Sequence, residues 1–254
     1  MNIERNVPLQ KPTESVSLTG EMYTSVLKRV HDKLKPKTYF EIGTLYGSTL
    51  ALSHCASIAV DPTFRLKTEA LVGKPSCQFF QMPSDEFFQR YSPRDLFQAP
   101  VDLAFLDGMH LFEFLLRDFI NTEKHCRVNS IIALHDCLPS DGYMASRSAS
   151  DPERSKSAHP DWWTGDVWKM VPTLKKYRPD LHLCVLDALP TGLVLVTNLD
   201  PSNEALRINY GKIVSEYRDV ALINYGVQLL LKESNVMRTS DLETFDDMAK
   251  YFWL

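Results

Sequence analysis

Two acid–histidine pairs in the sequence have residue types and spacing suited to proton transfer or metal binding. Asp107 and His110 lie in "FLDGMH", and His135 and Asp136 lie in "ALHDC". Each pair ends an apolar run. Carboxylate oxygens are ligands that Mg²⁺ or Mn²⁺ prefers, and a histidine can take a proton from a hydroxyl at neutral pH. The pairs predict a reactive centre if the fold brings them together.

The segments around these pairs alternate between strand-like and helix-like patterns. Short, continuously apolar runs predict strands at 38–43, 57–61, 76–82, 101–107 and 130–136. Helical patterns are found at 19–37, 44–55 and 111–126, with a further candidate helix at 65–74. Continuously apolar strands that alternate with helices are typical of a parallel sheet covered on both faces.

The last two strand-like runs differ from the others in their connection. Residues 181–188 and 192–198 are separated only by "LPT", which is too short for a crossover helix, so these strands must be antiparallel neighbours. We therefore predict an α/β fold with a Rossmann-like, seven-stranded, mostly parallel sheet that ends in an antiparallel hairpin. Ligands of such sheets bind beyond the carboxyl ends of the strands, where both acid–histidine pairs would lie.

Three segments flank or interrupt this frame of residues 19–200. Residues 1–18 are polar and predict an N-terminal arm, and residues 201–254 predict a helical extension. Residues 140–161 contain six serines and almost no apolar anchor. They predict a mobile loop over the site, because they directly follow the fifth strand.

Composition limits the partners of the chain. The net charge of −4 without a long basic run argues against nucleic acid, and no apolar stretch approaches the ~18 residues of a membrane helix. Five dispersed cysteines predict reduced thiols in a cytoplasmic protein. The apolar C-terminal segment is a candidate surface for a homo-oligomer.

The turn after the first strand has the features of a cofactor-binding loop. "FEIGTLYGSTLALS" places Glu41, Gly43 and Gly47 in an E-x-G-x-x-x-G pattern, and Asp61 ends the next strand. The glycines let a ligand approach the backbone, and a carboxylate after the second strand can accept both hydroxyls of a ribose. The alternative interpretations are a tight turn and a strand-end cap. The dinucleotide pattern G-x-G-x-x-G is absent, which disfavours a nucleotide-dependent oxidoreductase.

Taken in this order, over roughly residues 20–200, these residues resemble the class I S-adenosylmethionine-dependent methyltransferases. The resemblance implies that the glycine turn holds the methionine portion and that Asp61 binds the ribose. It also places "PSDEFF" near the adenine. The implied cofactor residues are Glu41, Gly43, Gly47, Asp61, Ser84, Asp85 and Asp107.

The acid–histidine pairs are similar to those of metal-dependent O-methyltransferases of the macrocin type, which act on sugar hydroxyls of natural products. Asp107-Gly108-Met109-His110 agrees with the Asp-x-x-His motif of that family. We interpret His110 as the general base, Asp107 and Asp136 as metal ligands, and His135 as a third ligand or a supporting group. His135 stands where that family has an acid, so a softer ion, or none, stays open. The alternative is that Asp107 caps the next helix and that His110 is merely solvated.

A third stretch, "WWTGDVWKMVPTL", predicts a helix after the serine-rich loop. The resemblance to O-methyltransferases of this type implies that the helix borders the acceptor pocket. Its candidate pocket residues are Trp163, Asp166 and Lys169. The alternative places the tryptophans in the core. Arg147 and Arg154 would meet an anionic substrate or remain solvated.

The sequence thus predicts an enzyme that transfers a methyl group to a hydroxyl of a small molecule or sugar. Its alternatives are an N-methyltransferase, a glycan methyltransferase and a non-catalytic, S-adenosylmethionine-binding regulatory protein.

Overall fold

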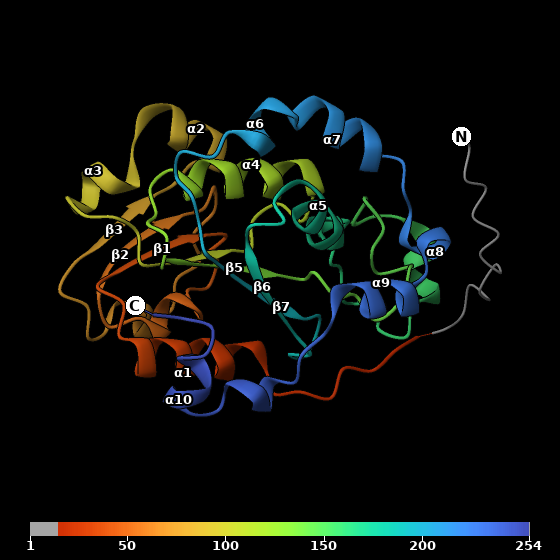
Figure 1. Ribbon diagram of the computed structural model, residues 1–254, viewed down its shortest axis with the longest axis horizontal. Helices are drawn as coiled ribbons and strands as arrows, with labels where there is room; N and C mark the ends of the chain where they lie inside the picture. Colours follow the sequence, from red (N-terminus) through yellow and green to blue (C-terminus); the bar gives the residue numbers. More distant parts are fainter. Residues whose placement is uncertain (1–14, 254) are drawn as a thin grey trace.

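A computed structural model describes residues 15–253, so most of the predicted N-terminal arm lies outside the described residues. A seven-stranded sheet with the order β3-β2-β1-β4-β5-β7-β6 forms the centre (Figure 1). Its strands are β1 (Thr38–Ile42), β2 (Ala56–Val60), β3 (Cys77–Phe80), β4 (Leu103–Leu106), β5 (Ile131–His135), β6 (His182–Leu186) and β7 (Leu193–Thr197). The first five strands pair in parallel, and β7 runs antiparallel to both β5 and β6. The predicted fold class and terminal hairpin are confirmed.

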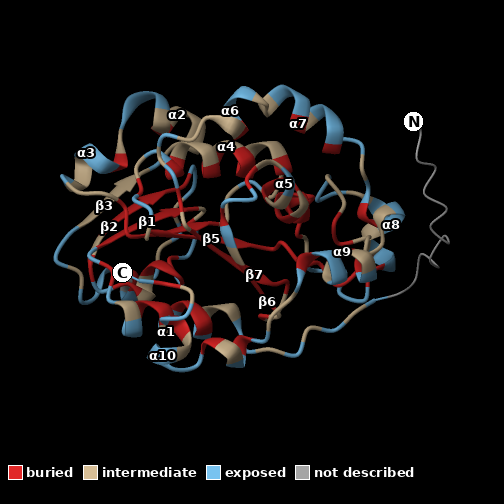
Figure 2. Cartoon of the chain, viewed as in Figure 1, coloured by how far each residue is buried: buried red, intermediate tan, exposed pale blue. Residues whose placement is uncertain are grey.

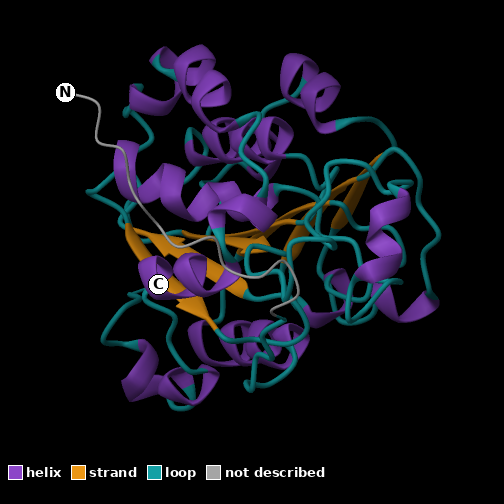
Figure 3. Ribbon diagram, turned by 90° about the vertical axis from the view of Figure 1, so that its right-hand side faces the viewer, coloured by secondary structure: helices purple, strands orange, loops and turns teal. Residues whose placement is uncertain are grey.

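The central strands are buried on both faces because helices cover each side (Figures 2 and 3). Alternate residues of one strand enter different cores, as the pleat requires. In β4, Leu106 packs in the core beneath α4, whereas Phe105 packs in the core beneath α1. Continuous apolarity in the strand sequence therefore reflects two cores that share one sheet.

Helices of different length form the two outer layers. The α-helices are α1 (Tyr23–Leu34), α2 (Ser84–Arg90), α3 (Pro93–Phe97), α4 (Phe112–Glu123), α5 (Met170–Tyr177), α6 (Ala205–Ile208), α7 (Tyr210–Tyr217), α8 (Leu222–Tyr225), α9 (Val227–Ser234) and α10 (Phe245–Met248). Buried residues of α2, α4, α5, α6 and α7 belong to one core, and those of α1 and α10 belong to the other. Among the described residues, no helix combines the length and apolarity that crossing a membrane requires.

The predicted helix at 44–55 is wrong. The segment contains only a 3₁₀ turn, η1 (Leu50–Leu52). Its apolar residues have helical spacing, but Gly43, Leu45 and Gly47 adopt φ values of +87°, +40° and +75°, which a right-handed helix cannot contain. The candidate helix at 65–74 is likewise a 3₁₀ turn, η2 (Thr68–Leu71). The first strand is therefore followed by an open loop, whose backbone can face a ligand.

The segment 140–161 has more anchors than its composition predicts. Met144 and Ala145 are buried, and Ala145 packs with Leu222 of α8. Both carboxylate oxygens of Asp141 accept hydrogen bonds from within the segment, including one from Ser157 Oγ at 2.7 Å. The expected lack of apolar anchors is wrong, because the segment packs against the C-terminal extension. Its mobility stays a prediction.

All five cysteines lie in the described part of the chain and are free thiols, as predicted. Each is buried except Cys77, which is half-buried.

Candidate active site

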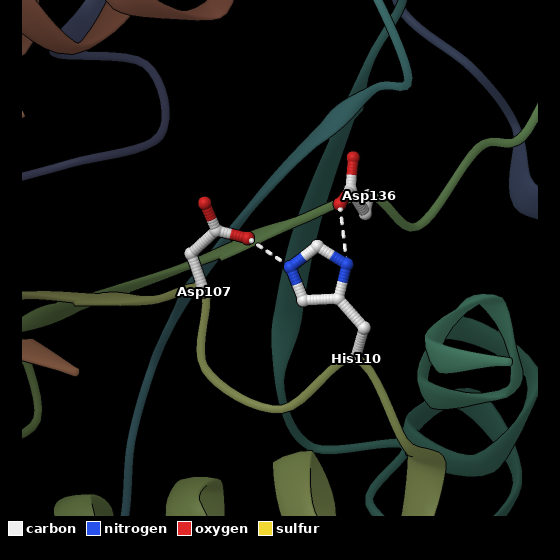
Figure 4. A group of neighbouring side chains, drawn as sticks. All are labelled: Asp107, His110 and Asp136. Carbon is white, nitrogen blue, oxygen red and sulfur yellow. Dashed lines mark ion pairs between the residues drawn. The ribbon is translucent and has the colours of Figure 1, made fainter. Parts of the chain in front are cut away.

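The two acid–histidine pairs converge because β4 and β5 are neighbours in register, with Leu106 opposite Leu134. Asp107 follows β4 directly, His135 ends β5, and Asp136 comes next. One donor atom from each of Asp107, His110 and Asp136 lies within 4.8 Å of the others (Figure 4). The strand tips thus bring together a group with metal-ligand spacing.

His110 bridges the two carboxylates. Its Nε2 lies 3.3 Å from Asp107 Oδ1, and its Nδ1 lies 3.2 Å from Asp136 Oδ2 and 3.0 Å from the carbonyl oxygen of Trp163. Burial lowers the pKa of His110, but the hydrogen bond and charge of Asp107 and the charge of Asp136 raise it to about 9. Burial would raise the pKa of Asp107, yet His135 and His110 hold it well below its usual range. At neutral pH and with no other cation nearby, His110 is therefore an imidazolium between two carboxylates.

Two residues of this group have backbone conformations that side chains rarely adopt. His110 has φ +58° and Asp136 has φ +60°. Lys35, Gln98 and Asn235 share this conformation, but each of them ends a helix, where it satisfies the last carbonyls. His110 and Asp136 lie at strand-tip loops instead. Backbone strain of this kind clusters at functional sites, where the surrounding structure maintains it.

His135 lies beside this group. Its Nδ1 is 3.3 Å from Asp107 Oδ1, whereas its Nε2 is buried without a hydrogen-bond partner among the described residues. Burial lowers the pKa of His135, but Asp136 and Asp107 together raise it above its usual value. The donor atoms that converge are those of Asp107, His110 and Asp136, so His135 fits the supporting role better than that of a third ligand.

A pocket of about 300 Å³, here called the strand-tip pocket, opens next to this group. It is lined by Tyr23, Gly43, Thr44, Leu45, Tyr46, Ser48, Thr49, Asp61, Asp107, Gly108 and His110. Gly43 is required here, because a Cβ on it would lie 2.0 Å from the carbonyl oxygen of Asp107. The close approach of the β1 and β4 loops therefore shapes the pocket.

Asp61 fixes the loop that forms one wall of the strand-tip pocket. Its two carboxylate oxygens accept the backbone N–H groups of Leu45 and Thr63 at 2.8 and 2.7 Å. A carboxylate oxygen has a second lone pair, so each oxygen can still accept a ligand hydroxyl. The predicted ribose-binding role fits this geometry.

Glu41 is completely buried at the end of β1. The Tyr39 hydroxyl donates to its Oε2 at 2.5 Å, and its Oε1 has no hydrogen-bond partner among the described residues. Burial raises the pKa of Glu41 to about 7, although Tyr39 and the nearby hydroxyls of Thr44 and Thr49 favour the ionised form. The chain thus buries an incompletely satisfied acid directly before the glycine turn, which destabilises the fold unless the acid serves a ligand.

A comparison with known families finds one similarity, over the central part of the chain. Residues 40–137 match the model of a family described as a methyltransferase domain. Over these residues the chain is similar to that methyltransferase domain. The match runs from β1 to the residue after Asp136. It contains the group of Asp107, His110 and Asp136, as well as Glu41 and Asp61. With the sheet order above, it supports the expected class I S-adenosylmethionine-dependent methyltransferase.

Several solved structures are similar to the chain in their fold. The O-methyltransferase TomG from Streptomyces achromogenes, in complex with SAM, has 15% identity and a TM-score of 0.47, over 69% of this chain and 78% of its own. The O-methyltransferase from Bacillus cereus, in complex with SAH, has 13% identity and a TM-score of 0.46, over 74% and 84%. Cofactor-bound Rv0187 from MTB has 12% identity and a TM-score of 0.48, over 73% and 84%. No curated protein matches the chain.

Four predicted cofactor residues lie outside the lining of the strand-tip pocket: the buried Glu41, described above, and Gly47, Ser84 and Asp85. Gly47 packs the loop against the following turn, where a Cβ would lie 2.7 Å from Cβ of Ala70. Both carboxylate oxygens of Asp85 accept hydrogen bonds from Arg117, at 2.9 and 2.6 Å. Ser84 is close enough to the buried Asp118 to lower the pKa of its carboxyl, which burial raises. The adenine-binding role of Ser84 and Asp85 stays a prediction.

The predicted acceptor residues separate into two places. Trp163 stacks on His110, with ring centroids 5.3 Å apart, and therefore borders the group formed by Asp107, His110 and Asp136. Asp166 and Lys169 are buried and paired at 2.7 Å, and they line a second pocket of about 470 Å³ with Arg147. Trp168 is core, as the alternative interpretation states. Arg154 donates to backbone carbonyls of its own segment and so serves that segment's structure.

Sequence reasoning missed Tyr23, the only contributor to the strand-tip pocket from α1 among the described residues. Tyr23 shares helical spacing with Val26, Leu27 and Val30, which are all core residues. The pattern therefore gave no signal to separate it from them.

Proposed function

We propose that the chain transfers the methyl group of S-adenosylmethionine to a hydroxyl oxygen of a small molecule or sugar, with His110 as general base and a divalent metal bound by Asp107 and Asp136. The observation that carries the proposal is the position of the base: Asp107 and His110 both line the strand-tip pocket. The proposed proton acceptor is therefore part of the lining of the pocket that we assign to the cofactor.

The strand-tip pocket fits the cofactor in its chemistry. Asp61 offers acceptor sites for ribose hydroxyls, and the buried carboxylate of Glu41 favours a cationic group nearby. S-adenosylmethionine supplies an activated methyl group, which passes to the acceptor oxygen as its bond to sulfur breaks and S-adenosylhomocysteine is left. The residues of the chain have to orient the acceptor and remove its proton.

The hydrogen bonds of His110 decide which nitrogen takes that proton. Nδ1 faces the carbonyl oxygen of Trp163 at 3.0 Å, so Nδ1 carries the hydrogen of the neutral ring. Nε2 is then the basic atom, and it lies on the side of Asp107. Stacking on Trp163 holds the ring in this orientation.

A cation is needed to make His110 a base at neutral pH. Its pKa of about 9 leaves the ring protonated, because two carboxylates stabilise the imidazolium. A divalent ion fits the same two carboxylates, since Mg²⁺ commonly binds through one or two carboxylates and water. Such an ion would lower the pKa of an acceptor hydroxyl and repel the proton on His110.

Binding and transfer experiments test this proposal. We expect the chain to bind S-adenosylhomocysteine in calorimetry, and Asp61→Ala to weaken that binding. With methyl-labelled S-adenosylmethionine and a panel of sugars and phenols, we expect label in a methyl ether and its loss on addition of EDTA. Binding without transfer to any hydroxyl would favour the non-catalytic alternative, and label on nitrogen would favour N-methylation. Absence of binding would refute the proposal.

A further inference from the structure

Tyr23 brings a phenol to the strand-tip pocket from outside the matched range of 40–137. It is the first residue of α1, and its ring packs on His135 with centroids 3.9 Å apart and an interplanar angle of 34°. Its side chain therefore lies over the end of β5, in the same pocket lining as Asp107 and His110.

The backbone of Tyr23 is held by the connection between β6 and β7. Its N–H donates to the carbonyl oxygen of Leu189 at 2.9 Å, and the N–H of Leu189 donates to the carbonyl oxygen of Glu21 at 2.7 Å. The N–H of Glu21 in turn donates to Thr239 Oγ1 at 3.0 Å. These bonds fix the start of α1, so the phenol needs no rearrangement to occupy this position.

The phenol of Tyr23 shares the lining of the strand-tip pocket with Asp107, and it lies within electrostatic reach of Asp136 and Glu41. Burial raises the pKa of Tyr23 well above its usual value, and the charges of Asp107, Asp136 and Glu41 raise it further. The hydroxyl therefore keeps its proton, and it makes no hydrogen bond within residues 15–253. A neutral phenol oxygen among carboxylates is a favourable neighbour for a cationic ligand group.

We propose that Tyr23 is a further cofactor-binding residue whose phenol oxygen contacts the polarised methyl group of the sulfonium. This inference rests on the proposed function and adds a specific consequence to it. With S-adenosylmethionine in the strand-tip pocket, the lone pairs of the phenol oxygen would be free to accept from the polarised methyl C–H bonds. Since S-adenosylhomocysteine lacks both the methyl group and the positive charge, Tyr23 favours the methyl donor over the product.

The test compares the affinities of Tyr23→Phe for the two ligands with those of the wild-type chain. This substitution removes only the hydroxyl and keeps the ring that packs on His135. We expect the ratio of the S-adenosylmethionine affinity to the S-adenosylhomocysteine affinity to fall about threefold, the factor for a weak C–H hydrogen bond. Calorimetry in EDTA removes any contribution from a metal. Tyr91→Phe is the matched control, because Tyr91 packs on Phe80 and Phe87 away from the pocket.

The outcomes separate this inference from the proposed function. A lowered ratio in Tyr23→Phe, with an unchanged ratio in Tyr91→Phe, supports the inference. A purely structural role would weaken both ligands equally, so an unchanged ratio in Tyr23→Phe overturns the inference even if both affinities fall. A wild-type chain that binds neither ligand overturns the proposed function itself.

Discussion

Glu41 gives the sharpest quantitative prediction, because burial raises its pKa from the ordinary value of 4.5 to about 7. Between about pH 4.5 and about pH 7, the folded state retains the proton of Glu41, whereas the unfolded chain releases it. The stability that this group contributes is therefore fully present below about pH 4.5 and is lost as the pH rises to about 7. A difference of roughly 2.5 pH units corresponds to about 3 kcal/mol of unfolding free energy.

The substitution Glu41→Gln isolates this contribution. Glutamine keeps the shape of the side chain and can accept the hydrogen bond of Tyr39, but it does not ionise. Urea unfolding of both proteins between pH 4 and pH 8.5 gives the difference in unfolding free energy between wild type and variant at each pH. As the pH rises from about 4.5 to about 7, we expect the wild type to lose about 3 kcal/mol of unfolding free energy relative to the variant. Below and above this range, the difference should not depend on pH.

A second buried acid serves as the control. Burial raises the pKa of Asp118 from 3.8 to about 7, so Asp118→Asn should show a similar trend at a separate buried site in α4. If the difference for Glu41→Gln is independent of pH while that for Asp118→Asn is not, Glu41 is ionised in the free protein, and our explanation of its burial is wrong.

Four further predictions concern the site. His110→Ala should lower turnover by about 10²–10⁴-fold while S-adenosylhomocysteine affinity holds, because only the proton acceptor is lost; unchanged turnover would remove His110 from the mechanism. The imidazole of His110 should titrate near its pKa of about 9 in the free protein and at lower pH after Mg²⁺ is added, as followed by NMR; a titration that Mg²⁺ leaves unmoved would argue against a metal at the carboxylates. Asp136→Asn should weaken Mn²⁺ binding at least tenfold in calorimetry, whereas equal affinity would place the ion elsewhere. Gly43→Ala should abolish S-adenosylhomocysteine binding, because its Cβ would lie 2.0 Å from the carbonyl oxygen of Asp107; retained affinity would contradict the close loop approach.

Residue patterns could predict the sheet and the meeting of the two pairs. Continuous apolar strands and a three-residue connection leave few topologies, and adjacent parallel strands place Asp107 and Asp136 at one edge. The loop after β1 could not be predicted in the same way. Some of its apolar residues, such as Tyr46 and Leu50, are spaced as in a helix, and only the backbone shows that Leu45 takes a positive φ to bind Asp61.

Partners that depend on packing between distant elements were also beyond the sequence. Asp85 appears free in its motif, but α2 and α4 pack together and place Arg117 against it. Tyr23 has the spacing of a core residue, and only the hydrogen bonds of its backbone to Leu189 place it over His135. Both positions depend on contacts between segments that local patterns do not encode.

The proposed transfer requires a cofactor and a cation to meet at the tips of β4 and β5. A crystal structure of the chain with S-adenosylhomocysteine and Mn²⁺ tests this most directly. We predict the cofactor sulfur in the strand-tip pocket beside Asp107, and an anomalous peak between the carboxylates of Asp107 and Asp136. A strand-tip pocket without the cofactor, or manganese bound away from both carboxylates, would contradict it.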